Sequence, residues 1–302
     1  MKKIKEEALI IIKKHYPNIS EENIVVSQGN DHDVYIVNNT ITFRFPKIPR
    51  EIDPKKSEFL KKLVSVSPFP IPSIEVHIDN ETGISYEMNE FISGVSFYPA
   101  IAETFSHEEL MFVAQKLGEF LSVIHAYPLE EARKLHLDEM DPEDFWAYME
   151  QNPNAFPKFK ALVYPYIFRE EQEWIERLFK DYIALVRETP FETRVTHADM
   201  WTYHIIVDPD KHTFSGVIDF WGRIADPAND FKAFEYYGSD FVKEVYKGYT
   251  LPRDENFEKR RLFYTGHDEV FELARSIERG DERKIKICKE SLSAYIKAHP
   301  LT

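Results

Sequence analysis

The chain has 302 residues, of which 43% are hydrophobic, 14% aromatic and 30% charged. This composition is typical of a globular protein with one large domain or two modest ones, and it excludes a disordered chain, a collagen-like repeat and a coiled coil. The formal net charge of −14 argues against a nucleic-acid-binding protein, which needs a basic face to displace counterions from phosphates.

The acidic excess lies mainly in the C-terminal part of the chain. Residues 1–90 carry 12 basic and 14 acidic side chains, a net charge of −2, and residues 91–302 carry 26 and 38, a net charge of −12. An acidic surface attracts cationic ligands, although solubility is the simpler explanation of the charge alone.

The single cysteine, Cys288, excludes an internal disulfide and a cysteine zinc site. The N-terminal apolar run is too short for a signal peptide or membrane span, so a cytoplasmic protein without a membrane partner is expected.

The first 90 residues predict a small, mostly antiparallel sheet with an inserted helix. Apolar residues at helical spacing predict helices over 4–16 and 55–66. β-Branched runs bounded by turn residues predict strands at 23–26, 34–37, 40–45, 74–78 and 84–88.

Beyond residue 90 the pattern becomes mainly helical. Helices are expected at 107–126, 142–150, 170–188, 239–248, 255–278 and 282–297. Residues 191–231 interrupt them with loops and strands that are rich in His and Asp. We therefore predict an α+β fold with an N-terminal lobe of residues 1–90, a C-terminal lobe of residues 91–302, and a ligand cleft at their junction.

The segments VTHADMWTYHIIVDPD (195–210) and FSGVIDFWGRIADPANDF (214–231) contain the most informative pattern. Two short strands should pair as a hairpin, which would place His204, just before the first strand, beside Asp219, just after the second. Asp199 lies five residues before His204 and can join them. Two carboxylates and a histidine at one strand end suit a hard cation such as Mg²⁺, and a carboxylate left free can orient a hydroxyl. These are the requirements of phosphoryl transfer.

The ordered pattern H-x-D-x4-H followed by I-D-F resembles the catalytic and metal-binding loops of aminoglycoside phosphotransferases, in the protein-kinase-like superfamily. It is most similar to the 2''-phosphotransferase branch, in which histidine can replace the usual metal-binding asparagine. Segments over most of the chain resemble the same branch: residues 27–47, 68–73, 86–96, 117–128, 237–249 and 278–285. The resemblance implies a bilobal protein-kinase-like fold, with a small antiparallel-sheet N-lobe and a larger, mainly helical C-lobe. It also implies ATP or GTP as phosphoryl donor, Mg²⁺, and a part in antibiotic resistance.

By this resemblance, Asp199 is the catalytic aspartate that orients the substrate hydroxyl or accepts its proton. His204 and Asp219 take the metal-ligand positions. His197 supports the loop, and Asp230 anchors it structurally. The positions implied for nucleotide binding are Ser27, Gly29, Asn30, Asp31 and Arg44 at the phosphates, and Glu87, Met88 and Asn89 along the base.

Three departures from the family pattern put full activity in question. Arg44 stands where the family has lysine on the phosphates, and arginine is bulkier and reaches differently. The helix glutamate that should pair with this residue is not evident, because its position falls on Lys56 and only a shifted register would offer Glu58 or Glu51. The metal-binding triplet ends in Trp221, which is expected to fill space near the magnesium site or the substrate mouth.

The acceptor implied by the family is a small, cationic, hydroxyl-bearing molecule such as an aminoglycoside. Acidic side chains and aromatic rings suit such a polycation. The candidate acceptor residues are Trp201, Glu235, Asp268, Glu269 and Glu272, although a solvated acidic helix face or aromatic core packing explains each one as well.

Three alternatives remain open. The first is a kinase for a macrolide or a hydroxylated metabolite, because the same catalytic loop serves such enzymes. The second is a nucleotide-binding protein with little transfer activity, which the Arg44 and Lys56 departures favour and the retained Asp199 opposes. The third is a metal-dependent hydrolase that uses His197 and His204, although these histidines lack the H-x-x-x-H spacing of a helical metal site.

Overall fold

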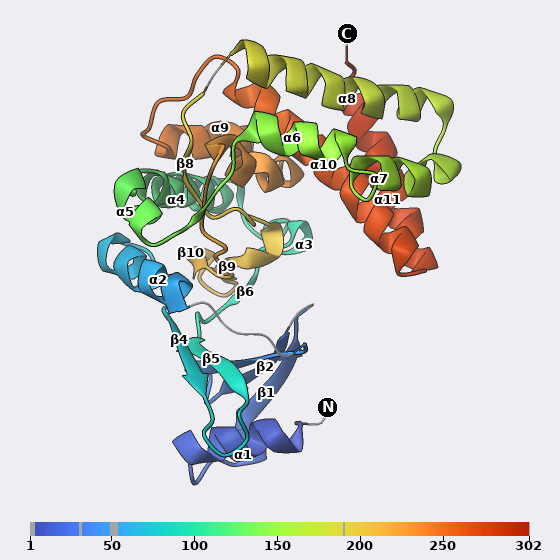
Figure 1. Cartoon of the computed structure of the whole chain (residues 1–302). Coiled ribbons are helices and arrows are strands. Elements are labelled where there is room, and N and C mark those ends of the chain that lie inside the picture. Colours follow the sequence, from blue (N-terminus) through green and yellow to red (C-terminus); the bar gives the residue numbers. More distant parts are fainter. Residues whose placement is uncertain (1–3, 30–31, 49–53, 190, 302) are drawn as a thin grey trace.

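A five-stranded antiparallel sheet forms a small lobe at the N-terminal end of the chain (Figure 1). The computed structural model describes residues 4–29, 32–48, 54–189 and 191–301. The order of the strands is β1-β2-β3-β5-β4. The elements of this part are α1 (Glu6–His15), η1 (Glu21–Asn23), β1 (Ile24–Gln28), β2 (His32–Val37), β3 (Ile41–Pro46), α2 (Pro54–Val66), β4 (Ile74–Ile78) and β5 (Ser85–Glu90).

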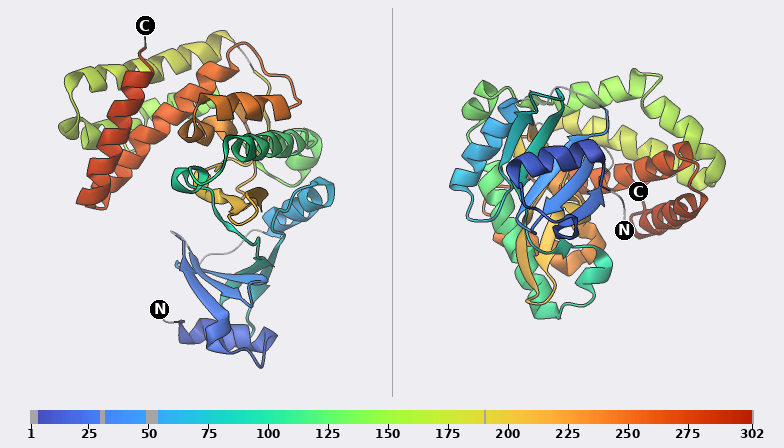
Figure 2. Two further views of the ribbon diagram at one scale, coloured as in Figure 1. Left: turned by 180° about the vertical axis from the view of Figure 1, so that it is seen from behind. Right: turned by 90° about the horizontal axis from the view of Figure 1, so that it is seen from below.

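The sheet has its own hydrophobic core, which it shares with α1. Ala8, Ile11 and Ile12 form the apolar face of this helix and pack against the side chains of Tyr35 and Phe43, which are 1% and 0% exposed. Seen from below, α1 lies over the sheet (Figure 2). Strand alternation places these side chains on one face, so burial on that face fixes the register of the meander.

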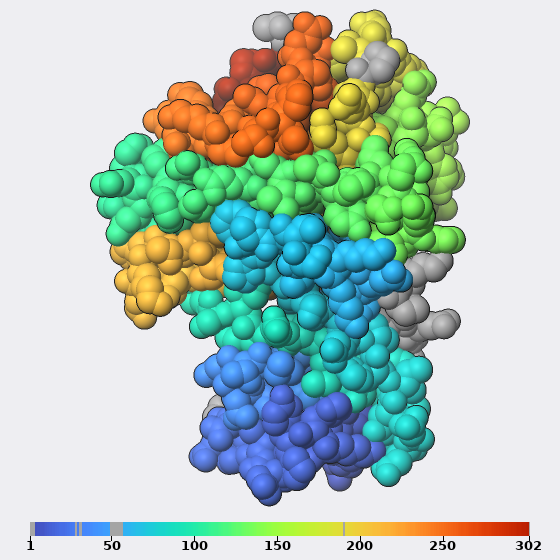
Figure 3. All heavy atoms as spheres, turned by 90° about the vertical axis from the view of Figure 1, so that its left-hand side faces the viewer, coloured from blue at the N-terminus to red at the C-terminus, as the bar shows by residue number. Residues whose placement is uncertain are grey.

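Helix α2 packs into the core of the larger lobe instead. Phe59, Leu60 and Leu63 are at most 1% exposed and belong to that core, and the ring of Phe59 meets Tyr127 edge to face at 5.4 Å. In the space-filling view, the light-blue α2 region lies directly against green residues of the larger lobe (Figure 3). The division of the chain into lobes of residues 1–90 and 91–302 remains a prediction. Helix α2 belongs to the first range, but its apolar side chains pack in the core of the larger lobe.

The larger lobe is mainly helical and contains two small sheets, β10-β9-β6 and β7-β11-β8. Its helices are α3 (Pro99–Ala102), α4 (His107–His125), α5 (Leu129–Lys134), α6 (Pro142–Gln151), α7 (Phe156–Val163), η2 (Tyr164–Tyr166), α8 (Arg169–Glu188), η3 (Thr202–His204), η4 (Pro227–Tyr237), α9 (Ser239–Gly248), α10 (Phe257–Glu278) and α11 (Glu282–Ala298). Its strands are β6 (Val95–Ser96), β7 (Asp138–Glu139), β8 (Arg194–Thr196), β9 (Ile205–Asp208), β10 (Thr213–Val217) and β11 (Arg223–Ala225).

The predicted α+β fold is confirmed, with a small antiparallel-sheet lobe and a larger helical lobe. The expected long helices are all present, and the structure adds the short helices α3, α5 and α7. These have four to eight residues, too few to give a clear hydrophobic period. Within the described part of the chain, no helix combines the length and apolar composition needed to cross a membrane.

Two glycines allow α4 and α9 to cross at backbone contact. A Cβ atom at Gly118 would lie 2.1 Å from the carbonyl oxygen of Val245, and one at Gly248 would lie 2.2 Å from that of Gln115. Only glycine fits at either position, because a rigid backbone atom occupies the space a side chain would need.

We expect Gly118→Ala to lower the free energy of unfolding by about 3 kcal/mol, since the two helices must move apart in a packed core. Denaturant unfolding followed by circular dichroism measures this change. Gly29→Ala is the control, because its Cβ would meet no atom closer than 3.6 Å. Equal stability of the two variants would show that the helices do not need this close approach.

Candidate active site

The β9–β10 hairpin brings His204 and Asp219 to the same end of two paired strands. Ile205 pairs with Val217, and the amide of Ile218 donates to the carbonyl of His204 at 2.9 Å. One possible ligand atom from each of Asp199, His204 and Asp219 lies within 4.8 Å of the others. The structure thus brings together the three residues that the sequence placed in one site.

Asp230 holds the loop that carries Asp199. Its carboxylate accepts hydrogen bonds from the amides of His197, at 2.6 Å, and Ala198, at 3.0 Å, and lies 3.1 Å from Nε2 of His125. Burial would raise the pKa of Asp230. The hydrogen bonds from His125 and from the amide of His197 lower it below its usual value, so the carboxylate is ionised. Ala198 has a φ of +68°, a left-handed conformation that costs a non-glycine residue energy unless its surroundings enforce it. The anchoring role predicted for Asp230 matches this geometry.

His197 is a structural histidine in this loop. Its Nε2 lies 3.0 Å from the carbonyl of Ile218, and its Nδ1 accepts the amide hydrogen of Asp199 at 3.2 Å. Burial lowers its pKa to about 4, so the ring is neutral near pH 7. With both ring nitrogens engaged, it supports the loop as expected and does not have the free nitrogen a hydrolase would need.

The tautomer of His204 is set by the backbone. Its Nδ1 lies 2.7 Å from the carbonyl oxygen of Asp199, which can only accept, so Nδ1 carries the proton of a neutral ring. Its Nε2 lone pair then faces Oδ2 of Asp219 at 3.4 Å. A lone pair and a carboxylate oxygen repel at this distance unless a metal ion, or a proton on Nε2, lies between them. The donor set of His204, Asp219 and Asp199 therefore fits a divalent ion.

The carboxylate of Asp199 lies in a partly buried, mixed electrostatic environment. Burial raises its pKa, and the negative charges of Asp219 and Asp268 raise it further, while the positive charge of Lys232, and that of His204 when its ring is protonated, lowers it. Its side chain is 31% exposed, so an acceptor can reach it. A proton acceptor that remains open to its substrate is the chemical requirement for a general base.

Arg44 connects the small lobe to this site. Its Nη2 donates to Oδ1 of Asp219 at 2.9 Å, and its Nη1 lies 3.6 Å from Oε2 of Glu87. Arg44 and Glu87 are directly opposite each other on β3 and β5. Glu87, which the sequence placed along the nucleotide base, thus turns a buried carboxylate toward Arg44. Glu58, one of the two expected partners, instead pairs with Lys62 at 3.4 Å.

The other described residues predicted to bind the nucleotide lie along the same sheet. Ser27 lies on β1, and Gly29 directly follows this strand and donates its amide hydrogen to the carbonyl of His32 at 3.0 Å. Met88 and Asn89 lie on β5, with Met88 packed on the small core. Asn30 and Asp31, like Glu51, lie outside the described residues. Nucleotide binding at these positions remains a prediction.

The structure does not gather the four predicted acceptor carboxylates into an open acidic pocket. Asp268 is buried and pairs with Lys232 at 2.8 Å. A hydrogen bond from His299 lowers the pKa of Glu235 to about 2, and Arg261 lies 2.7 Å from it. Glu269 is buried and accepts a hydrogen bond from Tyr236, and Glu272 pairs with Arg275 at 3.3 Å. Each of these carboxylates already has a partner within the protein, and their part in binding the acceptor remains a prediction.

Two tryptophans that the sequence placed near the site are partly exposed. Trp221 is 50% exposed, and its ring lies 5.3 Å from the guanidinium of Arg223. The Trp201 ring is stacked near the rings of both Tyr203 and Tyr236.

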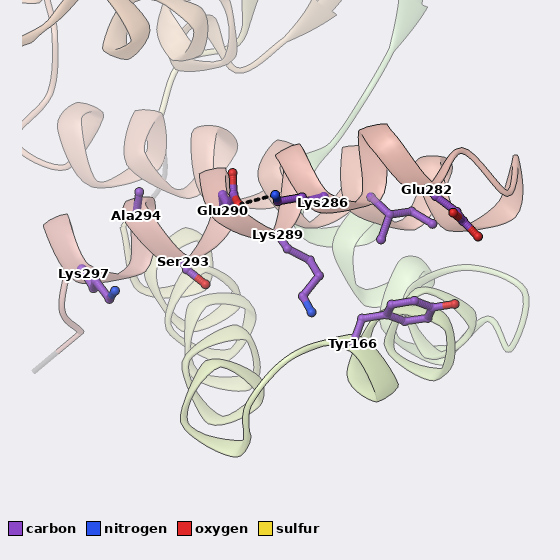
Figure 4. A pocket seen from close by; sticks show the side chains of 9 residues that line it. Tyr166, Glu282, Lys286, Lys289, Glu290, Ser293, Ala294 and Lys297 are labelled. Atoms are coloured by element: carbon purple, nitrogen blue, oxygen red, sulfur yellow. Dashed lines mark ion pairs between the residues drawn. The ribbon is translucent and has the colours of Figure 1, made fainter.

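A groove lies between α11 and Tyr166 of η2, and three lysines and two glutamates of α11 help to line it (Figure 4). It contains none of the residues discussed above, so it is separate from the candidate active site.

A small antiparallel-sheet lobe joined to a larger helical lobe, with Arg44 of the first contacting Asp219 of the second, is a kinase-like fold. A model of the phosphotransferase enzyme family matches residues 23–251. The chain belongs to this family. The resemblance seen in the sequence is thereby confirmed.

Several solved structures share the fold over nearly the whole chain. An APH(2") enzyme in complex with GDP and kanamycin is similar with a TM-score of 0.81 and 20% identity, covering 98% of this chain and 100% of the other. A streptomycin–ATP complex of APH(2")-IIa has a TM-score of 0.67 and 18% identity, with 97% of each chain covered. Macrolide 2'-phosphotransferase type I has a TM-score of 0.68 and 15% identity, covering 97% of this chain and 99% of the other. Among curated proteins, none matches the sequence significantly.

Proposed function

We propose that this protein is a small-molecule kinase that transfers the γ-phosphoryl group of ATP or GTP to a hydroxyl of an organic acceptor. The observation that carries the proposal is the meeting of Asp199, His204 and Asp219 within 4.8 Å, with Arg44 reaching Asp219 from the other lobe. Magnesium, which neutralises phosphate charge when bound, would be held by His204 and Asp219.

Each residue has a distinct task in this proposal. The carboxylate of Asp199 accepts the proton of the acceptor hydroxyl, whose oxygen forms a bond to the γ-phosphorus. The bond between that phosphorus and the β–γ bridging oxygen breaks, and the nucleoside diphosphate leaves. Arg44 binds phosphate oxygens, and the buried carboxylate of Glu87 orients its guanidinium from the opposite strand.

The acceptor class has two candidates. Family membership and the fold shared with kanamycin- and streptomycin-bound enzymes favour an aminoglycoside-like polycation. The pairing of Asp268 with Lys232 and of Glu235 with Arg261 favours a macrolide or another hydroxylated molecule with less positive charge.

We expect release of nucleoside diphosphate when the protein, Mg²⁺ and ATP or GTP are mixed with a suitable member of an acceptor panel. Aminoglycosides, macrolides and hydroxylated metabolites make up the panel, and each acceptor is scored with both nucleotides. Release that rises with acceptor concentration supports the proposal. Nucleotide binding without release for any acceptor would favour a binding protein, and acceptor cleavage without nucleotide would favour a hydrolase.

A further inference from the structure

A buried positive charge stands beside the proposed acceptor position. Lys232 lies on η4, and its side chain is 9% exposed. Its ammonium is 2.8 Å from Oδ2 of Asp268 and 5.1 Å from the centre of the Trp201 ring. Trp201 follows Asp199 by two residues, and the charge of Lys232 acts on the Asp199 carboxylate. An acceptor hydroxyl held at Asp199 would therefore lie near this ammonium.

The carboxylate next to the acceptor position is already neutralised. Burial would raise the pKa of Asp268, but Lys232 and His267 lower it, so the residue is ionised and paired. An ammonium group of a ligand would have to displace Lys232 from Asp268 or lie close to a like charge. Both alternatives cost free energy in a partly desolvated site.

Three aromatic rings lie beside Lys232 and Asp199. The rings of Tyr203 and Tyr236 lie 5.9 Å and 6.5 Å from Trp201, and their planes are tilted from it by only 9° and 21°. Trp201 and Tyr203 are half-buried, and Tyr236 is 36% exposed. Such ring faces stack on the apolar face of a ligand, and the cation that the Trp201 ring attracts is already supplied by Lys232.

We propose that Lys232 determines acceptor specificity: it balances the charge of the site and selects a hydroxylated acceptor of low charge with an apolar face over a polycation. The proposal rests on the kinase function proposed above, since it assigns the acceptor to the same site. It depends on the Lys232–Asp268 pair and on the row of three aromatic rings.

The test is the affinity for kanamycin, a polycation, measured by calorimetry in the presence of GDP. We expect weak binding by the wild type and binding at least about tenfold tighter by Lys232→Met, because the substitution removes a repelling charge and frees Asp268. Lys232→Arg, which keeps the charge, should bind as weakly as the wild type. Equal kanamycin affinity of the wild type and Lys232→Met would overturn the proposal.

Two further variants keep the test decisive. Lys243→Met removes an exposed lysine from α9 and should leave the affinity for kanamycin unchanged. If Lys232→Met does not fold because Asp268 is left unpaired, the variant Lys232→Gln removes the positive charge and keeps a hydrogen-bond donor for Asp268. It should still bind kanamycin more tightly than the wild type, and an unchanged affinity would contradict the proposal.

The acceptor panel separates this proposal from the kinase function itself. The wild type should release nucleoside diphosphate faster with acceptors that carry no amine or one amine than with kanamycin. A faster release with kanamycin would overturn the specificity proposal but not the kinase function. Absence of release with every acceptor would contradict the kinase function, whereas the calorimetric comparison does not depend on phosphoryl transfer.

Discussion

Asp199→Asn is expected to lower phosphoryl transfer by a factor of about 10³ or more while nucleotide affinity stays close to that of the wild type. The amide keeps the shape of the side chain but cannot accept the hydroxyl proton. The loop should keep its conformation, because the amides of His197 and Ala198 are held by Asp230 and not by the Asp199 side chain. Nucleoside diphosphate release and calorimetric titration of the nucleotide measure the two effects.

Asp210→Asn is the matched control for this substitution. Asp210 is an exposed aspartate in the β9–β10 turn, at the end of the hairpin away from the site, so its variant should transfer phosphate at the wild-type rate. If Asp199→Asn transfers phosphate as fast as this control, Asp199 is not the catalytic base.

Asp219→Asn is expected to have a second large effect, a loss of about 10³-fold in transfer together with weaker metal-dependent nucleotide binding. Asp219 combines two tasks, since one carboxylate oxygen accepts from Arg44 and the other faces His204. Its backbone has a φ of +63°, a conformation in which asparagine is also accommodated, so the loop should fold. The affinity for ATP should depend on Mg²⁺ in the wild type and much less in the variant.

Asp240→Asn serves as the control, because it removes one exposed carboxylate on α9 that pairs with Lys243. Its transfer rate and its dependence on Mg²⁺ should equal those of the wild type. A wild-type response to Mg²⁺ in Asp219→Asn would mean that the metal is held elsewhere.

The hairpin and the grouping of Asp199, His204 and Asp219 could be predicted from the sequence for a local reason. All three lie within a short stretch, and pairing of two adjacent strands leaves few arrangements of the residues at their ends. The antiparallel sheet was predictable for the same reason, since β1, β2 and β3 follow each other through tight turns.

The charge partners were not predictable, because they join elements that are distant in the sequence. Lys232 on η4 meets Asp268 on α10, and Arg44 on β3 meets Glu87 on β5. The net charge counts every carboxylate equally, whereas the packing of the folded chain decides which carboxylates are paired with a lysine or arginine. A lysine inside the apolar run Phe231–Phe234 was the one local sign, since a buried charge there needs a partner.

The packing of α2 also escaped the sequence analysis. Its apolar positions predict a helix, but nothing in their spacing says which lobe they face. Phe59 and Leu63 pack in the core of the larger lobe, beside residues that follow much later in the chain. Such choices depend on tertiary contacts, which a local hydrophobic period does not contain.

The central claim is that one divalent ion is held by His204 and Asp219 beside Asp199, and direct measurement of Mn²⁺ binding by electron paramagnetic resonance tests it. With GDP present, the wild type should bind Mn²⁺ in a protein–nucleotide complex, and His204→Ala and Asp219→Asn should each bind it at least about tenfold more weakly. The same Mn²⁺ affinity in the wild type and both variants would contradict the account.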